Sequence, residues 1–138
     1  MSDSRFDLPV VDGESVEWWA AIAEGRLLLE RCRVCGSIAS YPRSFCTRCW
    51  SEDVEWIPTA GTGAIYTFSV VRVNDLAPFN QRLPYVVAMV ELDEGPRLMT
   101  SIGDVEPEDV DIGMRVAFRP RVLDEHVSAP EFVPIGRR

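Results

Sequence analysis

Four cysteines are the residues of this sequence whose spacing indicates a definite chemistry. They form two C-x-x-C pairs, Cys32/Cys35 and Cys46/Cys49, with ten residues between the pairs. A two-residue gap lets both sulfurs of a pair reach one ion, and four thiolates form a closed tetrahedral site of the kind that holds structural zinc. Gly36 after the first pair favours a turn whose N–H groups fold over the sulfurs, whereas Trp50 holds the equivalent place after the second pair. The pattern predicts one structural Zn²⁺.

Three other uses of the four cysteines compete with zinc. A redox C-x-x-C needs only one pair and stands at the start of a helix in a thioredoxin-like setting, which this segment lacks. Two disulfides are typical of small secreted proteins with little core. A rubredoxin-like iron site uses the same four ligands, so the spacing alone does not separate iron from zinc.

The sequence lacks the residue patterns that are typical of a self-contained active site. The single histidine, His126, lies in a polar stretch that predicts an exposed loop. The sequence contains no G-x-S-x-G, H-E-x-x-H, P-loop or G-x-G-x-x-G motif. The acids between 104 and 111 are typical of a solvated surface. Since the metal uses all four thiols, we expect a protein that is not catalytic on its own.

Charge is distributed unevenly along the chain. The net charge is −8, and all 14 basic residues are arginines. Five of these arginines and only one acid, Glu30, lie between Arg26 and Arg48, so this segment carries about +4. It is either a solvated basic face or an anion-binding patch, for which Arg33 and Arg43 are the candidate residues. The acidic balance of the whole chain argues against a general nucleic-acid binder.

A short amphipathic helix precedes the cysteines. Asp12 suits the N-cap and Gly25 the C-terminal end, and Val16, Trp19, Ala20 and Ala23 share one face at helical spacing. Trp18 and Trp19 are adjacent and cannot both enter the same core strip. We therefore expect one indole in the core and the other either flat on neighbouring structure or against a partner subunit.

The remainder of the sequence predicts a mainly β protein. Short strands flank the cysteine pairs, and five strand patterns follow, at 64–73, 85–92, 97–102, 115–122 and 131–135, with one helical turn near 107–110. Five strands with a helical insertion after the third predict an OB-fold barrel. The expected organisation is an arm and helix over 1–25, a rubredoxin-like zinc ribbon over 26–59 and the barrel over 60–138. Phe79, in the 74–83 loop between the first two barrel strands, is a candidate ligand or partner contact.

The N-terminus lacks the charged and apolar regions of a secretory signal, and no stretch approaches the roughly 18 apolar residues of a spanning helix. We therefore expect a cytoplasmic protein without a membrane partner. Thiols stay reduced in that compartment, in agreement with a metal site.

Several segments together resemble one family. The order WWAAIAEGRLLLERCRVCG, YPRSFCTRCW, GTGAIYTFSVV, PYVVAMVELDEGPRLMT and IGMRVAF is similar to the zinc-ribbon/OB-fold acyl-CoA-associated proteins, the domain-of-unknown-function family numbered thirty-five, over about Val16 to Ile135. The resemblance implies a companion subunit of a thiolase-like or MaoC-type enoyl-CoA hydratase enzyme, which scaffolds the complex and helps to accommodate an acyl-CoA thioester. Only the four cysteines map onto the family's pattern as metal ligands. The alternative is a single-stranded nucleic-acid-binding module, because ribbons and OB folds often serve that role.

Overall fold

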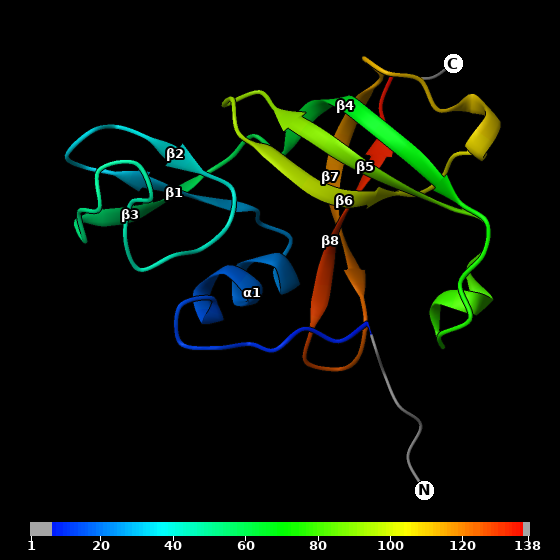
Figure 1. The fold of residues 1–138 in the computed structure, drawn as a ribbon, viewed down its shortest axis with the longest axis horizontal. Coiled ribbons are helices and arrows are strands. Elements are labelled where there is room, and N and C mark those ends of the chain that lie inside the picture. The colour runs from blue at the N-terminus through cyan, green and yellow to red at the C-terminus, as the bar shows by residue number, and fades with distance from the viewer. Residues whose placement is uncertain (1–6, 137–138) are drawn as a thin grey trace, which may run out of the picture.

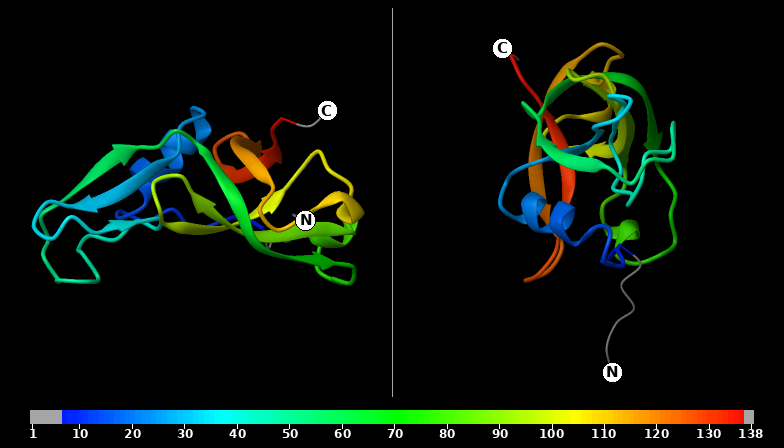
Figure 2. Two further views of the ribbon diagram at one scale, coloured as in Figure 1. Left: turned by 90° about the horizontal axis from the view of Figure 1, so that it is seen from above. Right: turned by 90° about the vertical axis from the view of Figure 1, so that its left-hand side faces the viewer.

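The computed structural model describes residues 7–136 and shows a small three-stranded sheet beside a closed five-stranded barrel (Figure 1). The two lie end to end along the long axis of the molecule (Figure 2). In chain order the elements are α1 (Val16–Ala23), β1 (Leu28–Cys32), β2 (Ile38–Ala39), β3 (Val54–Pro58), β4 (Thr62–Val71), η1 (Phe79–Gln81), β5 (Tyr85–Leu92), β6 (Arg97–Ile102), η2 (Pro107–Asp109), β7 (Arg115–Val122) and β8 (Ser128–Pro134). The mainly β fold class is confirmed. Residues 1–6 of the predicted arm lie outside the described residues.

The helix α1 begins and ends close to the predicted residues. The Asp12 carboxylate accepts hydrogen bonds from the N–H (3.1 Å) and the hydroxyl (2.8 Å) of Ser15, so Asp12 closes the turn before the helix and Ser15 takes the N-cap position. Gly25 has a φ of 87° at the other end, where its N–H donates to the carbonyl of Ile22. Glycine adopts this left-handed conformation without steric cost, which is why the helix stops there.

The buried face of α1 differs from the predicted one. Trp18, Ala21 and Ile22 are buried, whereas Val16 is 52% exposed and Trp19 is half-buried. Apolar residues occupy two stripes of this helix that are offset by one position, so helical spacing alone does not choose between them. The structure selects the stripe with Ile22. There the Trp18 Nε1–H also finds an acceptor, the carbonyl of Leu28, at 3.1 Å.

The small sheet has the order β2-β1-β3, with β1 in the middle and both neighbours antiparallel to it. Its register places Leu29 opposite Ile57 and Cys32 opposite Val54. The first cysteine pair therefore lies at the end of β1, in the turn that leads to β2. The second pair lies in the long connection between β2 and β3.

The barrel closes in the order β4-β5-β6-β8-β7, with β7 paired again to β4. The β6–β8 pair is parallel and all other pairs are antiparallel. Five strands in this order, with η2 between the third and fourth, confirm the predicted OB-fold barrel. At Gly63 the strands β4 and β5 approach so closely that a Cβ would overlap the carbonyl of Glu91.

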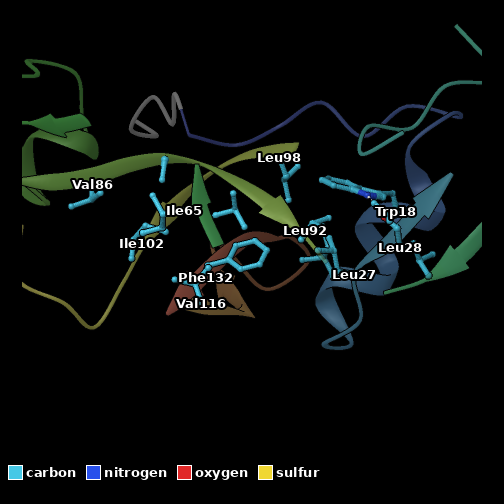
Figure 3. Close-up of a cluster of buried hydrophobic side chains, with 14 of the residues drawn as sticks. Trp18, Leu27, Leu28, Ile65, Val86, Leu92, Leu98, Ile102, Val116 and Phe132 are labelled. Carbon is cyan, nitrogen blue, oxygen red and sulfur yellow. Dashed lines mark hydrogen bonds between the residues drawn. The ribbon is translucent and has the colours of Figure 1, made fainter. Parts of the chain in front are cut away.

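One hydrophobic core runs from the ribbon end into the barrel (Figure 3). Trp18 and Ile22 of α1 join Leu29 of β1 to the barrel residues Leu98 and Phe132. The helix packs on β8 and β7 as well as on β1. Because the segments share this core, the division into 1–25, 26–59 and 60–138 as separate domains stays a prediction. Within residues 7–136 no helix has the length and apolar character needed to cross a bilayer.

Candidate metal centre and junction pocket

The four cysteines converge on one point, with all four Sγ atoms within 4.8 Å of one another. The Sγ atoms of Cys32 and Cys49 are 3.6 Å apart, as are those of Cys35 and Cys46. A tetrahedral ion with Zn–S bonds of about 2.3 Å requires sulfur separations of about 3.8 Å. Disulfide bonds need about 2.05 Å, and all four cysteines are free. The donor set and its spacing therefore suit one tetrahedral metal ion and exclude the two disulfides.

Backbone N–H groups prepare two of the sulfurs for metal binding. The N–H groups of Val34 and Cys35 point at Cys32 Sγ (3.4 Å each), and those of Arg48 and Cys49 point at Cys46 Sγ (3.3 and 3.4 Å). These hydrogen bonds stabilise the thiolate, so they lower the pKa of Cys32 and bring that of Cys46 to about 6. Metal ligation requires the thiolate form, which these hydrogen bonds favour at Cys32 and Cys46. Desolvation and the neighbouring sulfurs raise the pKa of Cys49 to about 12, so this thiol gives up its proton when a metal binds.

The two cysteine turns repeat the same backbone geometry. Gly36 donates its N–H to the carbonyl of Cys32 at 2.9 Å, and Trp50 donates its N–H to the carbonyl of Cys46 at 2.8 Å. Both residues have positive φ, 78° for Gly36 and 68° for Trp50. For a residue with a Cβ the left-handed conformation costs roughly 1–2 kcal/mol. The atypical Trp50 noted in the sequence thus makes the same turn as Gly36, at an energetic cost that glycine avoids.

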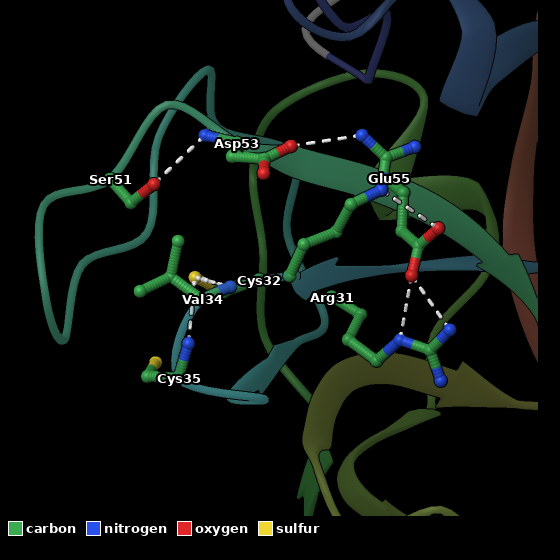
Figure 4. Close-up of polar contacts among 8 residues, drawn as sticks. Arg31, Cys32, Val34, Cys35, Ser51, Asp53 and Glu55 are labelled. Carbon is green, nitrogen blue, oxygen red and sulfur yellow. Dashed lines mark hydrogen bonds and ion pairs between the residues drawn. The ribbon is translucent and has the colours of Figure 1, made fainter.

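The charge counted along the basic segment is not the charge of its surface. Arg31 pairs with Glu55 at 2.6 Å, and Arg33 pairs with Asp53 at 2.9 Å and with Glu55 at 3.3 Å (Figure 4). Hydrogen bonds from Arg31 lower the pKa of Glu55, which keeps this acid ionised beside the arginines. Because β3 lies antiparallel to β1, Glu55 of β3 and Asp53 just before it meet two of the five arginines. Neighbouring acids therefore neutralise much of the predicted local charge of about +4.

The remaining arginines of the segment differ in their surroundings. Arg26 pairs with Glu24 at 2.6 Å on the exposed surface. Arg43 donates its backbone N–H to the buried Glu30, while its guanidinium donates to the carbonyl of Pro42 at 3.4 Å. Among the described residues neither the guanidinium of Arg43 nor that of Arg48 forms an ion pair.

A cavity of about 510 Å³ opens where the arm, α1, the loop after β2 and the barrel meet, and we call it the junction pocket. Its lining residues are Val10, Asp12, Glu14, Ser15, Trp18, Trp19, Tyr41, Pro42, Arg43, Leu98, Met99, Ala129 and Pro130. Two hydrogen bonds hold its walls together: the Tyr41 hydroxyl accepts the N–H of Met99 at 2.8 Å, and Glu14 accepts the N–H of Ser44 at 3.0 Å. No periodic pattern marks Tyr41 or Met99, so the sequence offered no signal for this pocket.

The three predicted ligand-binding residues do not meet in one place. Arg43 lines the junction pocket, and Arg33 pairs with Asp53 and Glu55. Phe79 lies in η1, at the end of the barrel far from β1–β3 (Figure 1), where its half-buried ring is 6.4 Å from that of Tyr85. Ligand binding by each of the three stays a prediction. His126 is exposed as expected, with a side-chain exposure of 81%.

Comparison with known proteins identifies both halves of the chain. Residues 19–55 match the rubredoxin-like zinc ribbon domain of ChsH2, and residues 56–120 match the C-terminal OB-fold domain of ChsH2. With this description the four-cysteine centre is a structural zinc site, as predicted.

Three relatives illustrate the range of the similarity. A DUF35 domain-containing scaffold protein of Methanocaldococcus jannaschii is 42% identical over 105 residues, which are 73% of this chain and 72% of that protein. A probable enoyl-CoA hydratase alpha subunit of Thermomonospora curvata is 33% identical over 126 residues, which are 91% of this chain but only 39% of the relative. A solved structure described as the Ltp2-ChsH2(DUF35) aldolase superposes with a TM-score of 0.82 at 33% identity, over 92% of this chain and 98% of that one.

The metal centre, the strand order and the relatives agree with the resemblance found in the sequence. The chain belongs to the DUF35 family of zinc-ribbon/OB-fold proteins.

Proposed function

We propose that this protein is a companion subunit of an acyl-CoA-processing enzyme of the thiolase-like or enoyl-CoA hydratase-like class, and that it is not catalytic on its own. One observation carries the proposal. The relatives include a scaffold protein, subunits of a hydratase and of a benzoylsuccinyl-CoA thiolase, and a chain of an aldolase complex. These names describe different reactions, so what the relatives share is a place in an assembly. A cytoplasmic location, where thiols stay reduced, is part of the proposal.

The described side chains support a role other than catalysis. Four thiols form the zinc site, and the exposed His126 lies 3.9 Å from Glu125 on the surface. Glu30 is buried and its pKa is raised by desolvation, as in many general bases. It lies, however, beside Cys32 and Cys46 in a space of about 20 Å³, which is too small for a substrate. Its hydrogen bond to the backbone of Arg43 marks it as a structural residue.

A direct contact with the CoA thioester is the finer part of the proposal. The junction pocket combines the aromatic wall of Trp19 and Tyr41 with the guanidinium of Arg43, which has no acid paired to it among the described residues. Such a guanidinium is available to a phosphate or carboxylate. Arg43 is therefore the predicted ligand residue that the structure supports most.

The experiment is co-expression of the chain with thiolase-like and MaoC-type enzymes encoded near it, followed by size-exclusion chromatography with light scattering. We expect a stable hetero-oligomer with one of them. We also expect no turnover of acyl-CoA by the chain alone. Turnover by the chain alone would contradict the non-catalytic role, and failure of every candidate enzyme to form a complex would contradict the companion role.

Substitutions in the complex test the CoA contact. Arg43→Glu should weaken binding of an acyl-CoA in a salt-dependent manner, since it reverses a charge at the pocket wall. Arg26→Glu is the matched control, because Arg26 is exposed and outside the pocket. Equal effects of the two substitutions would show that only the overall charge matters.

A further inference from the structure

Trp50 is a large apolar residue placed where the fold gains little from it. Its side chain lies at the tip of the second cysteine turn, and the residue is 71% exposed. Its backbone is left-handed, with a φ of 68°, a conformation that side chains with a Cβ rarely adopt. An exposed indole on a strained backbone does not contribute to stability through burial.

The metal site does not require tryptophan at this position. The first cysteine turn has the same hydrogen bond and the same backbone conformation with Gly36 in the equivalent place. Glycine there satisfies every geometric demand of the turn. The geometry of the turn therefore does not explain why the indole is there.

The two cysteine turns, whose sulfurs converge on one point, carry four residues that we call the ribbon tip: Val34, Phe45, Arg48 and Trp50. The Phe45 ring stacks on the indole with centroids 5.6 Å apart and planes at 19°, which restricts the orientations that the indole can take. Val34, on the other cysteine turn, is 66% exposed. A rigid aromatic side chain with exposed apolar neighbours has the composition of an interface hot spot.

We propose that the ribbon tip is the surface that docks on the partner enzyme, with the Trp50 indole inserted into an apolar pocket that has a carboxylate at its rim. The proposal rests on the companion function proposed above. The carboxylate follows from charge, because the guanidinium of Arg48 has no ion pair among the described residues. Glu52, the nearest acid along the chain, lies on the stretch that leads away into β3.

Two other occupants agree less well with these residues. In a symmetric contact between two copies of this chain the same patch meets itself, which would bring Arg48 close to its own copy. Single-stranded nucleic acid stacks on exposed aromatic residues, but a net charge of −8 opposes the approach of phosphates. Self-association and binding of single-stranded DNA are therefore measured beside binding to the enzyme.

The test compares Trp50→Gly with the unmodified chain in binding to the enzyme that co-purifies with it, by calorimetry at about 0.15 M salt. Trp50→Gly should keep its zinc and melt at the same or a higher temperature, because glycine removes the backbone strain. It should bind the enzyme at least about 30-fold more weakly. Arg48→Glu should weaken binding to the enzyme more strongly at low salt than at high salt. Ile112→Ser, at a 68% exposed apolar residue outside the ribbon, should bind normally.

The outcomes separate this proposal from the companion function. If no enzyme binds the unmodified chain, both proposals fail. If the enzyme binds Trp50→Gly as tightly as the unmodified chain, the docking surface is wrong and the companion function stands. Loss of zinc from Trp50→Gly, or a lower melting temperature of this variant, would show a structural role for the indole and overturn the proposal. Enzyme binding could be independent of Trp50 while self-association or binding of an oligo-dT probe depends on it. That result would assign the ribbon tip to a second copy of this chain or to single-stranded nucleic acid, and would overturn the proposal.

Discussion

Trp18 and Trp19 are adjacent in the sequence, yet we expect their removal to affect stability very differently. Trp18 is 5% exposed, belongs to the core between α1, β1 and the barrel, and donates its Nε1–H to the carbonyl of Leu28. Trp19 is half-buried against the edge of the Trp18 ring, with centroids 4.9 Å apart and planes at 86°. The pair is therefore an internal comparison with the same residue type on the same helix.

The magnitude follows from burial. Truncation of a fully buried tryptophan to alanine costs about 3–5 kcal/mol, and a half-buried one should cost about half as much. Unfolding entropy of roughly 2.1 cal/mol/K per residue gives about 0.29 kcal/mol/K for 138 residues. Trp18→Ala should then lower Tm by about 14 °C and Trp19→Ala by about 7 °C.

A third variant isolates the hydrogen bond. Trp18→Phe keeps most of the aromatic volume but leaves the buried carbonyl of Leu28 without its donor, which should cost about 1–3 kcal/mol. Differential scanning calorimetry of the zinc-loaded chain measures all three. Equal losses for Trp18→Ala and Trp19→Ala, or a larger loss for Trp19→Ala, would refute the assignment of Trp18 to the core.

Three further predictions concern the metal, an ion pair and a close backbone contact. Metal analysis should find one zinc per chain, and Cys35→Ser should unfold the ribbon. The free energy of zinc binding, about 10–16 kcal/mol, is folding energy for such sites. Purified protein without bound metal would contradict the assignment of the four cysteines as a metal site. Bidentate hydrogen bonds from Arg115 lower the pKa of Asp93 to about 2 from an ordinary 3.8. This pair stabilises the fold fully above pH 3.8, and its contribution is lost as the pH falls toward 2; Asp93→Asn should flatten the acid limb of Tm against pH, and an unchanged limb would exclude the pair as its cause. Gly63→Ala should lower Tm strongly, since its Cβ would overlap the carbonyl of Glu91, whereas Gly13→Ala has open space and should be neutral; similar Tm values for the two would show that β4 and β5 separate easily.

Strand positions in the barrel were predictable because each strand carries its own pattern. The predicted strands at 85–92, 97–102 and 115–122 coincide with β5, β6 and β7, and the helical turn near 107–110 coincides with η2. The alternation of apolar and polar side chains along a strand and the turn residues between strands are local signals. The barrel buries one face of each strand, which agrees with this alternation. The helix shows the limit of this reasoning, since two apolar stripes satisfied the same period and only packing against β1 and β8 decided between them.

The metal centre was determined by the sequence itself, because two short C-x-x-C turns place their sulfurs through local geometry. The charge of the ribbon and the junction pocket were decided only by tertiary structure. Arg31 meets Glu55, Glu14 meets Ser44, and Tyr41 meets Met99, at separations of 24, 30 and 58 residues. Such pairs form because β3 returns antiparallel to β1, because α1 packs between the small sheet and β8, and because the loop after β2 reaches β6. No local pattern specifies these contacts, since each depends on where another part of the chain lies after folding.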